Sequence, residues 1–143
     1  MTKIPSEHEL VSKAAEFLLR SRPEVFMAWP RATMCDWLRY HLRQRAVGIV
    51  ANGGNIEAVG VGWRSQLPDI DDRWAKWDDK GDCFYFDQLH ASNPEALANL
   101  ILLFTRAVQD WQELRLIAHR HGRRVLLKHQ TISRFYRLSK LRA

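Results

Sequence analysis

Apolar residues recur at helical spacing in the first third of the chain, and they predict two helices. The first stripe follows the i, i+3, i+4, i+7 spacing of one helix face: Val11, Ala14, Ala15 and Leu18. A capping box, Ser6-x-x-Glu9, precedes this stripe, so a helix is predicted from there to about Arg20. The second predicted helix, residues 31–45, begins after Pro30 and has its own stripe: Met34, Trp37, Leu38 and His41.

The pattern then changes to short apolar runs typical of strands. Residues 46–51 and 56–63 are separated by Asn52-Gly53-Gly54-Asn55, whose residues tolerate positive φ, so a hairpin is predicted. Gly60 and Gly62 indicate a bulge in the second strand, or a backbone that another chain or ligand approaches closely. Residues 65–80 are polar and are interpreted as a loop with a short helix.

A strand–helix–strand unit is predicted next. Residues 83–90 form an aromatic strand, the capping box Ser92-x-x-Glu95 opens a helix over residues 95–111, and residues 114–119 form a fourth strand. Leu102 and Leu103 widen the apolar stripe of that helix, so it is expected to be buried on more than one side, which makes a homodimer conceivable. A right-handed crossover would make the third and fourth strands parallel. Residues 123–138 fit either a strand pair or a short helix and a strand. The order predicts an α/β fold with a mixed sheet.

Composition narrows the class of protein. With 143 residues, 46% of them hydrophobic, the chain is expected to form one domain. No apolar run is long enough to span a membrane, and residues 1–5 lack the apolar region of a signal peptide. The two cysteines, Cys35 and Cys83, lie far apart and suit a reducing compartment, so a cytoplasmic location is predicted.

Positive charge is concentrated at the end of the chain. The net charge is +6, and residues 114–143 contain no acidic residue. Five of their cations are the predicted contacts for an anionic partner: Arg115, Arg120, Arg123, Arg124 and Lys128. Such a segment favours nucleic acid, a phosphorylated cofactor or an acidic protein, although a solvated basic surface is an equally ordinary interpretation.

One carboxylate, Asp87, interrupts the third strand. A buried charge without a partner is costly, so this residue is expected to be paired, protonated or functional. The structural alternative is an ion pair with an arginine of the C-terminal segment.

Three landmarks resemble a known family. They are Trp29-Pro30 after an N-terminal helix, the strand Ala58-Val59-Gly60-Val61-Gly62-Trp63, and Gly81-Asp82 followed by an aromatic run and Asp87-Gln88-Leu89. Together with the order of elements, they are similar to the GNAT-type acyltransferase fold, and more specifically to the toxin-activating lysine acyltransferases. Those enzymes transfer a fatty acyl chain from acyl carrier protein to a lysine. The resemblance spans about residues 23–120 and implies a three-layer α/β/α fold in which Asp87 is catalytic.

The resemblance has departures that bear on mechanism. The family's catalytic histidine is replaced by Phe26. Residues 89–94 contain no glycine, and Pro94 removes a backbone donor, so an acyl carrier protein is a better expected donor than acyl-CoA, with no permanently bound cofactor. His90 and His41 are the candidate replacement bases. On a regular strand His90 and Asp87 would face opposite sides, and a bulge at Asp87 would bring them to one side.

The same resemblance suggests an acyl-binding set: Trp29, Trp63, Phe84 and Phe86. Two other functions remain open, a catalytically silent adaptor with this fold and a nucleic-acid-binding protein that uses the basic segment. His119-x-His121 could contribute to a zinc site, but no carboxylate or cysteine follows Glu113, so no metal is predicted.

Overall fold

The computed structural model describes residues 6–21, 29–66, 72–120 and 123–142. Two helices come first, α1 (Glu7–Ser21) and α3 (Arg31–Arg43), and both were predicted. The Ser6 hydroxyl accepts a hydrogen bond from the Glu9 N–H at 3.2 Å, which confirms the predicted start of α1. Pro30 occupies the cap of α3, where its missing N–H costs nothing.

The middle of the chain forms the predicted hairpin. Strands β1 (Val47–Asn52) and β2 (Asn55–Ser65) are joined by Gly53 and Gly54, with φ of +63° and +113°. Strand β3 (Cys83–Ala91), helix α4 (Pro94–Ala107) and strand β4 (Arg115–Arg120) follow, with a 3-10 turn at Trp111–Glu113. Strand β5 (Arg123–Leu127) and helix α5 (His129–Arg142) complete the structure.

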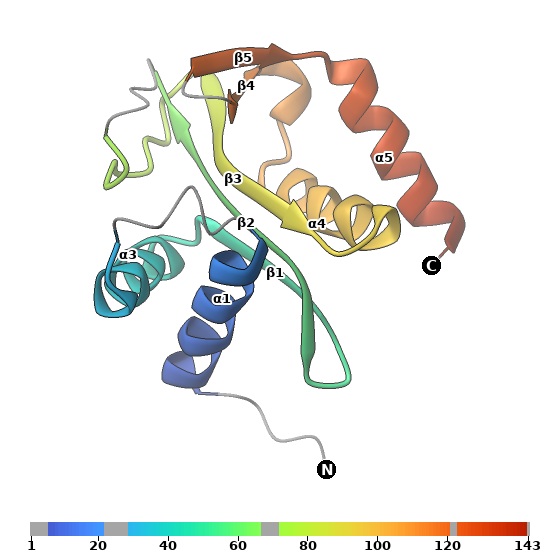
Figure 1. Ribbon diagram of the computed structural model, residues 1–143. Coiled ribbons are helices and arrows are strands. Elements are labelled where there is room, and N and C mark those ends of the chain that lie inside the picture. The colour runs from blue at the N-terminus through green and yellow to red at the C-terminus, as the bar shows by residue number, and fades with distance from the viewer. Residues whose placement is uncertain (1–5, 22–28, 67–71, 121–122, 143) are drawn as a thin grey trace.

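The five strands lie in chain order, β1-β2-β3-β4-β5. Strands β3 and β4 are parallel, as the crossover rule predicts, and the other three pairs are antiparallel. Helices cover both faces of the sheet, α1 and α3 on one side and α4 and α5 on the other (Figure 1). The predicted α/β fold, with two helices, a hairpin and then a strand–helix–strand unit, is therefore confirmed.

Three local predictions were wrong. The cap of α4 is Asn93, whose side chain accepts from the Ala96 N–H at 2.8 Å, and the helix ends at Ala107. The described part of the predicted loop with a short helix, residues 65–66 and 72–80, contains no helix, and residues 67–71 lie outside the described residues. The end of the chain is one strand followed by a long helix, which neither interpretation of residues 123–138 anticipated.

Two apolar clusters hold the layers together. On the α1/α3 face the core includes Leu18, Trp37 and Trp63, and on the α4 face it includes Phe84 and Leu100. Both clusters are buried, which is the main source of stability for a chain of this length.

The structure corrects the predictions made from the glycines of β2. The register between β2 and β3 shifts between Val61 and Gly62, but the extra residue at this shift is Asp87 of β3, so the bulge lies on the neighbouring strand and not on β2. A Cβ at Gly60 would lie 2.8 Å from the Phe104 ring, so the close neighbour is α4 of the same chain. No second chain or ligand is needed to explain this glycine.

The wide apolar surface of α4 also has a partner within the chain. Helix α5 packs alongside α4 (Figure 1), and Leu102 is buried as predicted, whereas Leu103 is 40% exposed. The surface that suggested a homodimer is thus largely covered by α5. Among the described residues, no helix is both long and apolar enough to cross a membrane.

Candidate functional site

The candidate site lies where β3 and β4 separate. Gln88 pairs with Val61 and Phe86 with Gly62, so Asp87 is an extra residue that has no partner on β2. The parallel pairing of β3 with β4 ends at Phe86 and Ala118. The next residue on each strand is Asp87 and His119, and both lie at the point of separation.

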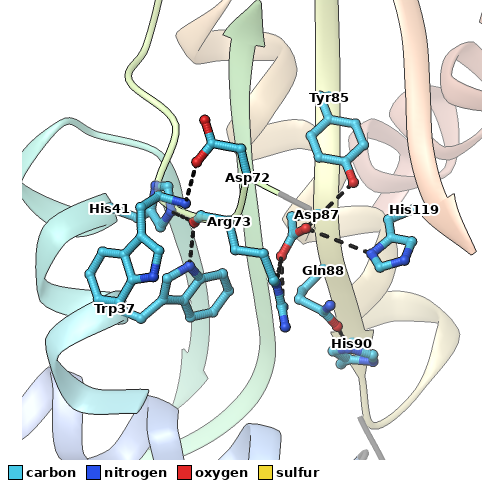
Figure 2. A network of polar contacts seen from close by, with 10 residues as sticks. Trp37, His41, Asp72, Arg73, Tyr85, Asp87, Gln88, His90 and His119 are labelled. Atoms are coloured by element: carbon cyan, nitrogen blue, oxygen red, sulfur yellow. Dashed lines mark hydrogen bonds and ion pairs between the residues drawn. The ribbon is translucent and has the colours of Figure 1, made fainter. Parts of the chain in front are cut away.

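Asp87 contacts three side chains from three parts of the chain (Figure 2). Its Oδ2 accepts hydrogen bonds from Arg73, at 2.8 Å from Nη2 and 3.2 Å from Nε. Its Oδ1 lies 3.7 Å from Nδ1 of His119 and accepts a long hydrogen bond, 3.5 Å, from the Tyr85 hydroxyl. The Asp87 side chain is fully buried, whereas that of His119 is 20% exposed.

These contacts decide the charge of Asp87. Burial alone would raise the pKa of its carboxyl, but His119 and Arg73 outweigh burial and hold the pKa below its usual value. Burial, together with the charge of Asp87, raises the pKa of Tyr85, so the phenol stays protonated and can only donate to the carboxylate. Asp87 is therefore an ionised, buried carboxylate at neutral pH.

The arrangement of Asp87 and His119 is suited to proton transfer. His119 Nδ1 faces the Asp87 carboxylate at 3.7 Å, and an imidazole that carries its proton on Nδ1 has the Nε2 lone pair available. A carboxylate that orients an imidazole and stabilises its protonated form is a recurrent support for a general base.

Arg73 is the anchor of this network, and it corrects a prediction. The expected arginine partner of Asp87 was one from the C-terminal segment, but Arg73 belongs to the loop before β3. Its carbonyl oxygen accepts from Trp37 Nε1 at 2.6 Å and from His41 Nε2 at 2.7 Å. Its guanidinium lies over the rings of Trp29 and Trp37, at 4.7 and 5.0 Å from their centroids.

His41, a candidate base, is buried and occupied on both nitrogens. Nε2 donates to the Arg73 carbonyl, and Nδ1 accepts from the Gln44 amide at 2.8 Å, an assignment based on these partners. Burial lowers the pKa of His41, and the ring stacks on Trp63 at 4.7 Å. His41 thus holds the backbone of Arg73 in place, with neither nitrogen available to a substrate.

His90, the other candidate, lies on the same face as Asp87. The bulge produces this placement, because His90 pairs with Val59 and Gln88 with Val61, and both valines belong to the α1/α3 core. The His90 ring hydrogen-bonds to Gln88 Oε1 at 2.5 Å. The imidazole that is paired with Asp87 in Figure 2 is that of His119.

The structure divides the predicted acyl-binding residues between the two faces of the sheet. Trp63 is on the same face as Asp87 but only 1% exposed, and half-buried Trp29 lies over Arg73. Phe84 and Phe86 are in the core beneath α4. Trp29 is the one member of the set that is both near the network and partly exposed.

The predicted anion-binding cations also separate. Arg120 pairs with Arg123 and His119 with Arg124, so these three arginines gather at the β4–β5 hairpin end beside the candidate site. Arg115 begins β4 at its other end, where it forms an ion pair with Asp82 at 3.2 Å. Lys128, just after β5, also lies at that end, because the preceding residue, Leu127, pairs with Leu116.

Sequence reasoning missed Arg73, Tyr85 and His119 as members of the site. The sequence did contain a signal for His119. In the parallel pair, Cys83 lies opposite Arg115, and Asp87 and His119 are each four residues further along their strands, so they lie side by side. No comparable signal existed for Arg73, which lies in an irregular polar loop.

The chain was compared with protein-family models and with curated protein sequences, and neither comparison finds a match. Phe26, the predicted departure from the resembled family, lies outside the described residues.

Proposed function

We propose that this protein is an acyltransferase that moves an acyl group from a thioester to an amine, with His119 as general base. The observation that carries the proposal is the Asp87–His119 pair at the separation of two parallel strands. Ligands of α/β sheets commonly bind beyond the carboxyl ends of such strands.

In the proposed reaction, the amine attacks the thioester carbonyl carbon and His119 Nε2 takes the proton that the amine loses. The carbon–sulfur bond then breaks, the acyl group stays on the nitrogen as an amide, and the imidazolium returns the proton to the leaving thiolate. Asp87 remains ionised throughout and stabilises the imidazolium, because His119 and Arg73 together hold the pKa of its carboxyl below its usual value.

The class of reaction is supported by the resemblance to GNAT-type acyltransferases and to the toxin-activating lysine acyltransferases. Asp87 stands where that family has its catalytic aspartate, at the end of a strand parallel to the next one. In this proposal His119 replaces the histidine that the family carries at the position of Phe26, and His41 and His90 are not catalytic.

The proposed donor is an acyl carrier protein. Arg120, Arg123 and Arg124 are exposed at the hairpin end next to His119, where an acidic carrier would bring its thioester close to the imidazole. Trp29 is the proposed contact of the acyl chain, because it is partly exposed and lies over Arg73.

Thiol release from a long-chain acyl carrier protein, with a lysine peptide as acceptor, tests this function. Asp87→Asn and His119→Gln should each slow release by about 100-fold or more, the usual contribution of a general base. His90→Gln is the matched control and should keep the rate of the unaltered protein. Circular dichroism should show that all three variants are folded. A His119→Gln variant with full activity would show that the base lies elsewhere.

A binding module without catalysis is the second candidate, because the Asp87 side chain is fully buried and its charge already satisfied by Arg73. It predicts that Asp87→Asn unfolds the protein and that acyl carrier protein binds equally with and without its acyl chain. If nucleic acid binds instead at the hairpin end, Arg123→Ala and Arg124→Ala should each weaken that binding and make it less dependent on salt concentration.

A further inference from the structure

A hollow of about 1080 Å³ lies between the C-terminal end of α3 and the loop before β3. None of the residues that contact Asp87 lines it. Four cations do so: Arg39, Arg43, Arg45 and Lys76. Its volume is slightly above the usual range of small-molecule sites, roughly 300–1000 Å³.

The charge of the hollow is unbalanced. Arg39 forms ion pairs with Asp36 at 3.1 Å and Glu7 at 3.6 Å, and Arg43 pairs with the same Glu7 at 3.2 Å. Arg45 and Lys76, however, form no ion pair with any residue in the part of the chain that the structure describes. Two acidic residues, Asp36 and Asp79, line the hollow, so cations exceed anions and an anionic ligand is favoured.

Arg45 adopts a backbone conformation that arginine rarely takes. Arg45 directly follows Gln44, the C-cap residue of α3, and its own φ is +62°. Its N–H donates to the Leu42 carbonyl at 3.1 Å. Glycine is the usual residue at this left-handed position because it has no Cβ to strain. Arginine here is less stable than glycine, and such strain is typical of functional positions.

The walls of the hollow are preformed and partly aromatic. Gln44 donates to the Ala75 carbonyl at 3.0 Å and accepts from the Trp77 N–H at 2.8 Å, which fixes the loop against α3. Tyr40 and Trp77 both line the hollow and are partly exposed. An aromatic ligand ring can stack on side chains of this kind while its phosphates meet the arginines.

We propose that this hollow binds a phosphate-bearing small molecule with an aromatic ring, of the class of nucleoside diphosphates. Arg45 and Lys76 hold the phosphates, and Tyr40 and Trp77 contact the ring. This site is separate from the proposed acyl-transfer site and does not depend on it.

The test is a titration of the full chain with ADP, followed by tryptophan fluorescence and by calorimetry, with adenosine and pyrophosphate as separate probes. ADP should bind saturably, and each of the other two should bind more weakly, because each lacks one half of the recognised chemistry. Binding of pyrophosphate as tight as that of ADP would overturn the aromatic part of the proposal. No saturable binding of ADP at millimolar concentration would overturn all of it.

Two variants separate a specific site from general charge. Arg45→Gly with Lys76→Ala should weaken ADP binding by about 100-fold, since a hydrogen bond to a charged group contributes about 10-fold or more and two are removed. Lys13→Ala with Arg20→Ala removes the same charge from exposed positions of α1 that do not line the hollow, and should leave binding unchanged. An equal loss in both pairs would show that only non-specific attraction is present.

Arg45→Gly alone adds an independent readout. Because glycine relieves the strained φ, this variant should melt roughly 3–5 °C higher without ligand while binding ADP more weakly. A variant that is more stable and binds ADP as tightly as the unaltered protein would show that Arg45 has no role in binding.

Discussion

At the scale of single residues, the central feature is a buried carboxylate whose charge is retained. Asp87 would be expected to lose its proton less readily when buried, yet Arg73 and His119 lower its pKa. Arg73 can do so because its backbone is fixed by Trp37 and His41, which leaves its guanidinium little freedom. Two of the three predicted catalytic residues, Asp87 and His41, thus both contact Arg73, which sequence analysis did not identify.

The Arg73–Asp87 pair gives a prediction about stability. Arg73→Met should lower the free energy of unfolding by about 3 kcal/mol at pH 7, because it leaves a buried charge without its main partner. Arg115→Met is the control: its ion pair with Asp82 is exposed to water, so its loss should change the free energy of unfolding little. Urea denaturation measures both.

The pH dependence of the same variant has a definite sign. In the unaltered protein the lowered pKa of Asp87 contributes stability above its unfolded pKa, and this contribution is lost as the pH falls through the folded pKa. In Arg73→Met, burial should raise the pKa of Asp87. Protonation of Asp87 at lower pH then removes the cost of its buried, unpaired charge. The difference in the free energy of unfolding between this variant and the unaltered protein should therefore shrink towards pH 4. If this difference in the free energy of unfolding stays constant from pH 7 to pH 4, loss of the ion pair is not its cause.

At the scale of elements, the spacing of apolar residues predicted most of the helices and strands, but it did not predict those at the end of the chain. The stripes of α1 and α3, the glycine turn and the parallel β3–β4 pair all follow from local spacing and from the crossover rule. Residues 123–142 alternate weakly, so spacing alone could not separate β5 from α5. Sequence analysis stated what a bulge at Asp87 would do but could not predict that one forms. The bulge depends on how β3 pairs with β2 and not on the sequence of β3 alone.

The fit of α4 against the sheet can be tested at Gly60. A Cβ there would meet Phe104 Cε2 at 2.8 Å and Leu89 Cδ2 at 3.0 Å, so Gly60→Ala should destabilise the protein by about 1–3 kcal/mol. Gly60→Ala combined with Phe104→Leu should cost less than the sum of the two single changes, because the smaller side chain leaves room for the methyl group. Thermal denaturation of the three variants measures the coupling, and strict additivity would contradict the proposed contact.

At the scale of the whole molecule, the final helix completes the core. Ile132 of α5 is 4% exposed and packs in the cluster of Phe104 and Trp111, so α5 shields the second side of α4 from water. Among the described residues, the large hydrophobic side chains that remain exposed are scattered: Trp74, Leu103 and Leu126. Scattered apolar residues are normal for a monomer, whereas a contiguous patch is typical of an interface.

This arrangement predicts that the unaltered protein is a monomer and that loosening α5 makes it associate. Ile132→Asp places a charge in the apolar cluster, so α5 should detach and expose α4. Light scattering after size-exclusion chromatography should then show a mass that rises with concentration. Gln130→Asp makes the same charge change at an exposed position of α5 and should remain monomeric. A stable dimer of the unaltered protein would contradict this, because it would require an interface that the covered face of α4 does not supply.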